Sequence, residues 1–110
     1  MHAARLGLTL VLALAAPDTA VEVRTFRFRE SAVEVPVGSE VRWINGDEIG
    51  HTVSAGTPER RDPLFDGTLD GAGATFAHRF DRAGTYPYFC ARHPFMRGEV
   101  RVVTHTEGAP

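Results

Sequence analysis

The 110-residue sequence has one cysteine, no lysine and no apolar run longer than the eleven residues 6–16. A single cysteine excludes an internal disulfide, so the core alone has to stabilise the fold. Eleven apolar residues are too few to span a bilayer, which takes about 20. No stretch has helical periodicity long enough for a main element, and the length allows one domain at most. These absences predict a small, single-domain β protein.

All 12 basic residues are arginine, and 14 acidic residues outnumber them, which gives a formal net charge of −2. The two signs alternate along the chain. A nucleic-acid-binding domain is expected to show a basic excess or a clustered basic stripe. The charge pattern therefore excludes nucleic acid as a partner.

Residues 1–20 have the features of a secretory signal peptide: a positive start at Arg5, the apolar run, and small residues around a cleavage point. We expect cleavage after Ala20, with cleavage after Ala16 as the alternative. A buried N-terminal helix is the competing interpretation, but Pro17 and the aspartate after it end the run where the polar boundary of a signal falls. The prediction is a periplasmic protein with no membrane insertion after cleavage.

The rest of the chain consists of short β-prone runs separated by turn residues. Val33, Val35 and Val37 alternate as in a half-buried strand, and Pro36, which cannot donate to a ladder, indicates an edge position. Pro87 indicates an edge position for a later strand. About seven short strands with this spacing predict an all-β, two-sheet Greek-key sandwich. The expected strands are residues 21–28, 32–37, 40–45, 51–55, 74–80, 84–90 and 98–104.

The least regular stretch is 56–69, where prolines, glycines and charges predict a loop with at most one short turn of helix. The predicted domain covers residues 21–104. Residues 105–110 are expected to be a flexible tail.

Near the C-terminus, Cys90, His93 and Met96 follow one another at intervals of three residues. With five histidines and two methionines in the chain, both fall at these offsets by chance roughly once in a thousand. A lone thiol in an oxidising compartment has to be buried, paired with another chain or bound to a metal. Because its neighbours at this spacing are an imidazole and a thioether, the pattern indicates a metal site.

Thiolate and thioether are soft ligands that suit copper, and one cysteine, two histidines and a weak axial methionine make a blue-copper site. The second imidazole has to come from elsewhere in the fold. His51 is the best candidate, because it starts a strand-like segment after a turn-rich stretch. The remaining histidines are not expected to be ligands: His2 lies in the signal, His105 in the tail, and His78 on a strand with phenylalanines, which indicates a half-buried or surface residue.

The sequence resembles the cupredoxin family, in particular its plastocyanin and amicyanin branch, over nearly all of residues 21–104. The resemblance is carried by the segments 35–45, which ends in Trp43-Ile44-Asn45, 51–53 (His-Thr-Val), 65–67 (Phe-Asp-Gly) and 84–90. The loop from Cys90 to Met96, with Pro94 and Phe95 inside it, is similar in length to that of amicyanin. Arg92 stands where a small residue or proline is expected in amicyanin.

The resemblance implies one copper ion, with His51 and His93 as imidazole ligands, Cys90 as the thiolate and Met96 as the axial thioether. It also implies that Asn45 ties the upstream segment to the ligand loop by hydrogen bonds. The implied function is a mobile, monomeric electron carrier, not an enzyme, that cycles Cu(I)/Cu(II) between periplasmic redox partners of the dehydrogenase or cytochrome c type.

The loop residues around His93 predict how such partners are met. Pro94 and Phe95 would form an apolar electron port beside the imidazole, as in small transient redox interfaces. Arg92 and Arg97 flank this port and would steer an acidic partner.

Two alternatives remain open. A periplasmic copper chaperone or storage protein would use the same soft ligands without an intense blue Cu(II) form. A metal-free interaction module would leave Cys90 free. Oxidase chemistry would need additional histidine pairs, and only four histidines follow residue 20.

Overall fold

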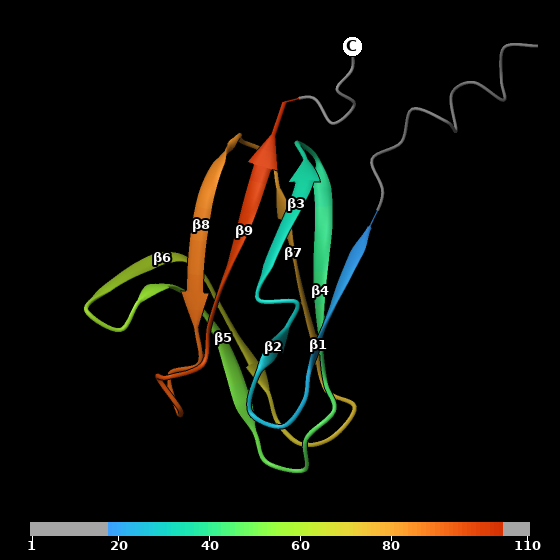
Figure 1. Cartoon of the computed structure of the whole chain (residues 1–110), viewed down its shortest axis with the longest axis vertical. Helices are drawn as coiled ribbons and strands as arrows, with labels where there is room; N and C mark the ends of the chain where they lie inside the picture. Colours follow the sequence, from blue (N-terminus) through green and yellow to red (C-terminus); the bar gives the residue numbers. More distant parts are fainter. Residues whose placement is uncertain (1–17, 105–110) are drawn as a thin grey trace, which may run out of the picture.

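The computed structural model describes residues 18–104, which form two β-sheets packed face to face (Figure 1). The all-β, two-sheet prediction is confirmed, although residues 18–104 contain nine strands rather than about seven. Most of the predicted signal peptide and the predicted tail, including His2 and His105, lie outside the described residues. The strands are β1 (Thr19–Val23), β2 (Phe28–Arg29), β3 (Ala32–Pro36), β4 (Ser39–Asn45), β5 (His51–Thr57), β6 (Arg60–Leu69), β7 (Thr75–Phe80), β8 (Gly84–Phe89) and β9 (Arg97–Val103).

One sheet has the strand order β2-β1-β4-β7 and the other the order β3-β9-β8-β5-β6. β3 is an edge strand, so the edge position predicted from Pro36 is confirmed. The same prediction for Pro87 is wrong, because β8 lies between β9 and β5. A proline is tolerated at this position because β8 pairs with β5 only at Tyr88 and Phe89. Pro87 has no partner residue in β5, so the missing N–H of proline does not break a hydrogen bond between these two strands.

Two segments differ from the predicted strand pattern. The strand expected over 21–28 is broken into β1 and β2, because Thr25 and Phe26 adopt left-handed backbone angles, with φ of 51° and 57°. The loop expected over 56–69 is instead the end of β5 and all of β6, joined by a hairpin. β6 is an edge strand with its first half exposed, so it accommodates charges and Pro63 that otherwise indicate a loop.

The core between the sheets is built around Trp43, which is fully buried. Its ring lies 6.0 Å from that of Phe65, 5.9 Å from that of Phe76 and 5.2 Å from that of Tyr88, measured between centroids. Aromatic side chains from both sheets therefore interlock at the centre of the sandwich.

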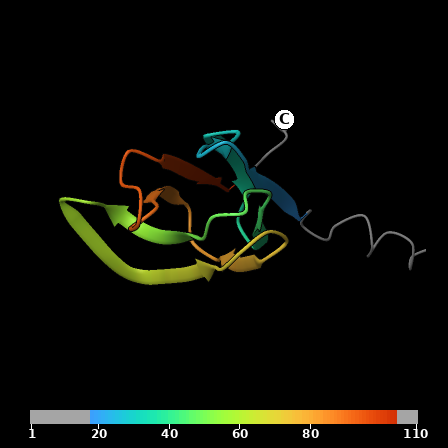
Figure 2. The same cartoon turned by 90° about the horizontal axis from the view of Figure 1, so that it is seen from below.

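Four connections meet at one end of the sandwich, the lower end in Figure 1: β1–β2, β4–β5, β6–β7 and β8–β9. Figure 2 shows this end from below, with the hairpin of β5 and β6 reaching out to one side. Residues of separate strands thus converge at this one end.

In residues 18–104 there is no helix that is both long and apolar enough to cross a membrane.

Candidate metal centre

Two segments of the chain bring the predicted ligands to the converging end. His51 is the first residue of β5, and Cys90 directly follows β8. β5 and β8 are antiparallel neighbours, with Ser54 opposite Phe89, so the start of one strand lies beside the end of the other. This pairing explains why two residues 39 positions apart in sequence meet.

The loop after β8 is closed by backbone hydrogen bonds at three-residue intervals. The N–H of His93 donates to the carbonyl of Cys90 at 3.2 Å, and the N–H of Met96 donates to the carbonyl of His93 at 2.9 Å. The N–H of Cys90 in turn donates to the carbonyl of Met96 at 3.1 Å. The equal spacing in the sequence therefore corresponds to two successive turns, which return the chain to β9.

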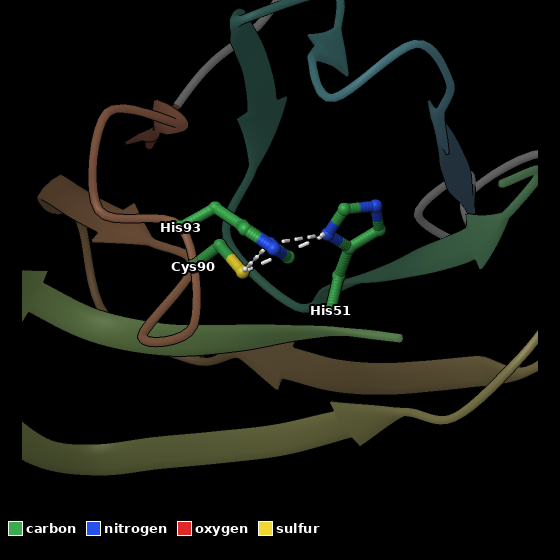
Figure 3. Close-up of side chains that lie close together, drawn as sticks. All are labelled: His51, Cys90 and His93. Carbon is green, nitrogen blue, oxygen red and sulfur yellow. Dashed lines mark hydrogen bonds between the residues drawn. The ribbon is translucent and has the colours of Figure 1, made fainter. Parts of the chain in front are cut away.

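The side chains of His51, Cys90 and His93 point toward one another (Figure 3). The sulfur of Cys90 lies 3.8 Å from Nδ1 of His51 and 3.7 Å from Nδ1 of His93. The two Nδ1 atoms are 3.2 Å apart. Sequence reasoning predicted this trio, and the structure brings all three together.

The donor triangle has the size that a transition metal requires. A triangle with sides of 3.2, 3.7 and 3.8 Å has a circumradius of about 2.1 Å, within the ~2.0–2.3 Å range of bonds from a metal to imidazole nitrogen and thiolate sulfur. One thiolate and two imidazoles are also the trigonal donor set of a blue-copper site. The residues present therefore fit a copper ion.

The protein shields three of the four predicted ligands from water. Cys90 and His51 are fully buried and Met96 is 2% exposed, whereas His93 is only half-buried. Met96, the predicted fourth ligand, is the last residue of the loop before β9, and its thioether is buried. His93 provides the edge of the site nearest to solvent.

Thr52 connects β5 to the ligand loop. Its backbone N–H donates to the sulfur of Cys90 at 3.3 Å, and its Oγ1 accepts the N–H of Ala91 at 2.7 Å. Oγ1 also lies 2.9 Å from Oγ of Ser54, which donates to Asp66 at 2.7 Å. A backbone donor aimed at the sulfur helps to fix its position beside the two imidazoles.

Asp47 contacts the second nitrogen of His51. Its Oδ2 lies 2.8 Å from Nε2, and an ionised carboxylate can only accept, so Nε2–H is the donor. In the neutral ring, Nδ1 then carries the free lone pair, and this atom faces Cys90. Burial acts to raise the pKa of Asp47, but hydrogen bonds from the N–H of Phe26, from His51 and from the N–H of Thr25 outweigh it and lower this pKa below its ordinary value. Asp47 lies in the turn-rich stretch before His51, and the sequence pattern assigned it no role at the site, although it stands four residues before the histidine.

Asn45 occupies a different role from the one expected. Its Nδ2 donates to the carbonyls of Ile49, Leu69 and Gly71, and its Oδ1 accepts the N–H of Asp47 at 2.9 Å. None of these partners belongs to the ligand loop, so the expected tie between Asn45 and that loop is wrong. Asn45 instead shapes the β4–β5 connection behind His51, and the tie to the loop comes from Thr52.

An aromatic surface covers the solvent side of the site. Phe95 is 70% exposed, and Phe26 is 36% exposed. The ring centroid of Phe26 lies 5.2 Å from that of His51 and 4.9 Å from that of His93, in edge-to-face contact with both. Phe26 was read from the sequence as part of a strand, and only its left-handed backbone turns it onto the imidazoles.

The residues of the predicted port are exposed, and the two arginines that flank it are already paired. Pro94 is exposed next to His93. Arg92 donates to Asp70 at 3.0 Å, and Arg97 lies 3.4 Å from a carboxylate oxygen of Glu59. Both pairs are well exposed, and such surface pairs contribute little to stability.

His78 lies away from the site, as the sequence indicated. Its ring is half-buried between Phe65 and Phe80, at 4.8 Å from each centroid. Burial lowers the pKa of His78, and the charge of Asp81 only partly offsets this. It is a structural residue of β7.

Comparison with known proteins agrees with this geometry. Residues 15–103 match the family described as copper binding proteins, plastocyanin/azurin family. The chain belongs to this family and is a cupredoxin, so its cofactor is copper.

Amicyanins are among the curated relatives. Amicyanin-alpha of Methylorubrum extorquens is 31% identical over 87 residues, which cover 79% of this chain and 73% of that protein. Amicyanin of Paracoccus versutus is 33% identical over 82 residues, which cover 74% of this chain and 62% of that protein. Among solved structures, a purple cupredoxin from Nitrosopumilus maritimus superimposes with a TM-score of 0.70 at 27% identity, over 77% of this chain and 99% of that one.

Proposed function

We propose that this protein is a mobile, monomeric electron carrier with one copper ion bound by His51, Cys90, His93 and Met96. The observation that supports this most is the buried triangle of one thiolate and two imidazole donors, whose size fits a copper ion. Copper in such a donor set supplies one-electron Cu(I)/Cu(II) chemistry.

The chain holds the proposed ligands in place before any metal arrives. His51 is fixed by the ladder of β5 and by Asp47, and Cys90 by the end of β8 and by the N–H of Thr52. Because the donors belong to a closely packed sandwich, the same arrangement has to serve both oxidation states. A site that does not rearrange favours fast electron transfer.

The number of protein ligands argues against catalysis. Four protein ligands leave no open position for a substrate, whereas catalytic metal sites keep one open. We therefore propose that the protein transfers electrons and does not itself transform a substrate.

Electrons would enter and leave through the half-buried ring of His93. Phe95, Phe26 and Pro94 surround it with an exposed apolar surface, small enough for a transient complex with a dehydrogenase or a cytochrome c. Arg92 and Arg97 beside it would attract an acidic partner. Replacing both arginines by glutamine should weaken the salt dependence of electron transfer to ferricyanide, an anionic probe; an unchanged salt dependence would contradict the steering role.

The absorption spectrum tests the copper assignment. Protein loaded with Cu(II) is expected to show an intense band toward the red end of the visible spectrum. Cys90→Ser should abolish the band, whereas His78→Gln, which changes a histidine outside the site, should retain it. A colourless protein that binds only Cu(I) would favour the copper chaperone, and a protein that binds no copper would refute both proposals.

We also propose that residues 1–16 form the cleaved part of an export signal to the periplasm. β1 begins at Thr19, and Thr19 and Ala20 pair with Val41 and Arg42 of β4. Cleavage after Ala16 leaves this strand whole, whereas cleavage after Ala20 would remove two paired residues. The mass of the protein recovered from the periplasm distinguishes the two sites.

A further inference from the structure

The side chain of Asp47 binds two parts of the chain at once. Its Oδ2 accepts Nε2–H of His51 at 2.8 Å and the backbone N–H of Phe26 at 3.0 Å, and its Oδ1 accepts the N–H of Thr25 at 2.7 Å. The backbone of Asp47 is itself held by Asn45. Although Asp47 is on a surface connection, its side chain is only 11% exposed.

The β1–β2 turn that donates to Asp47 is strained. Thr25 and Phe26 both have left-handed backbone angles, which residues with a Cβ rarely adopt and which persist only where the surroundings enforce them. Arg24 and Arg27 close the turn with reciprocal backbone hydrogen bonds of 3.0 and 3.2 Å. The two N–H groups inside it converge on one carboxylate, as in backbone nests that bind anions.

The strained turn has a direct effect on the site, because it sets the position of the Phe26 ring. That ring contacts the imidazoles of both His51 and His93, edge to face. The carboxylate of Asp47 therefore holds the imidazole of His51 directly, through Nε2. By holding the turn, it also keeps the Phe26 ring against the imidazoles of both His51 and His93.

We propose that Asp47 is a positioning residue that couples the imidazole of His51 to the Phe26 cap and tunes the metal centre. By accepting Nε2–H it fixes the tautomer in which Nδ1 faces the metal, and its negative charge makes the ring a stronger donor. A stronger donor favours Cu(II) over Cu(I) and so lowers the reduction potential. The part of this inference that concerns tuning rests on the proposed copper function.

The central test compares Asp47→Ala with Glu48→Gln. Glu48 is the adjacent, exposed acidic residue, so its replacement removes a like charge without touching His51. Asp47→Ala is expected to lower Cu(II) affinity by about 10–100-fold, as for other partners of metal-bound histidines. If the loss falls on Cu(II) alone, each tenfold corresponds to a rise of about 59 mV in reduction potential. Glu48→Gln should leave both quantities near those of the parent protein.

A second readout needs no copper. In the metal-free protein, nitrogen NMR should show His51 protonated at Nε2, and the amide hydrogens of Thr25 and Phe26 should be protected from exchange. Asp47→Ala should lose both properties. Asp47→Asn keeps the size and one acceptor oxygen, so it is expected to fold even if Asp47→Ala does not, and to shift the potential in the same direction by a smaller amount.

The outcomes separate this inference from the proposed function. If Asp47→Ala and Asp47→Asn match Glu48→Gln in amide exchange, histidine tautomer and potential, the positioning role is refuted. If the parent protein binds no copper while the two NMR signatures depend on Asp47, the proposed function fails but the structural coupling stands.

Discussion

Replacing Thr52 by valine tests how the ligand loop is attached to β5. Valine has nearly the shape of threonine, so the change removes the hydroxyl and little else. Oγ1 is the acceptor for the N–H of Ala91, and Thr52 is 9% exposed, so water has poor access to the orphaned donor. A buried donor left without a partner costs about 1–3 kcal/mol. Ser54 keeps its bond to Asp66, and the backbone bond from Thr52 to the sulfur remains.

Urea unfolding of the metal-free protein measures this cost directly, followed by the fluorescence of Trp43, the only tryptophan. Absence of metal matters, because bound copper would add its own stabilisation. We expect the free energy of unfolding to fall by about 1–3 kcal/mol with an unchanged m value. In a domain of this size each kcal/mol corresponds to a drop of about 4–8 °C in Tm.

Two variants control the experiment. Thr52→Ser keeps the hydroxyl and loses one methyl group, so it should cost about 0.8 kcal/mol or less. Thr57→Val removes a hydroxyl that accepts the N–H of Arg60 at 3.0 Å in the exposed β5–β6 hairpin, where water can replace it, so its effect should stay within about 0.5 kcal/mol. Equal losses in Thr52→Val and Thr57→Val would refute the reasoning.

Three further predictions concern the rest of the sandwich. Gly67→Ala should destabilise the protein by about 1–3 kcal/mol in urea unfolding, because a Cβ there would clash with the ring of Phe76; unchanged stability would mean that the ring moves aside freely. Burial raises the pKa of Tyr88 to about 12, an interaction with Trp43 offsets this only in part, and the hydroxyl makes no hydrogen bond of good geometry within residues 18–104. Tyr88→Phe should therefore raise the unfolding free energy by about 1 kcal/mol, and a loss of stability would show that the interaction with Trp43 outweighs the burial of the hydroxyl. Burial lowers the pKa of His78 below its ordinary 6.5, so the unfolded chain binds more protons just below that pH and stability should increase as the pH rises toward 6.5. His78→Gln should reduce this increase in thermal unfolding scans, and an identical pH dependence in both proteins would contradict it.

Much of the fold follows from local patterns in the sequence. Alternating apolar residues predicted β3 and β4 nearly to their ends, because one face of each strand is buried and the other is exposed. β6 escaped prediction because its first half is exposed on both faces and so carries no alternation. The break between β1 and β2 also escaped, because nothing in the local residue types of Thr25 and Phe26 indicates a left-handed backbone.

The site divides in the same way. The meeting of Cys90 and His93 could be predicted because a loop with three-residue turns brings their side chains together by itself, and Met96 closes the same loop. His51 needed the resemblance to cupredoxins, since its meeting with Cys90 depends on strand pairing. Asp47 could not be recognised as its partner, because an aspartate in a turn has an adequate local explanation.

By itself, the sequence determined the β-rich class, the three ligand candidates of the loop and the soft donor chemistry that selects copper. These depend on residue type and short spacing, which the chain carries at every stage of folding. The tertiary structure decided the second imidazole, the replacement of Asn45 by Thr52 as the tie to the loop, and the Asp47 contact that links His51 to Phe26. Each of these joins residues from different strands, and only the packing of the two sheets brings them within hydrogen-bond distance.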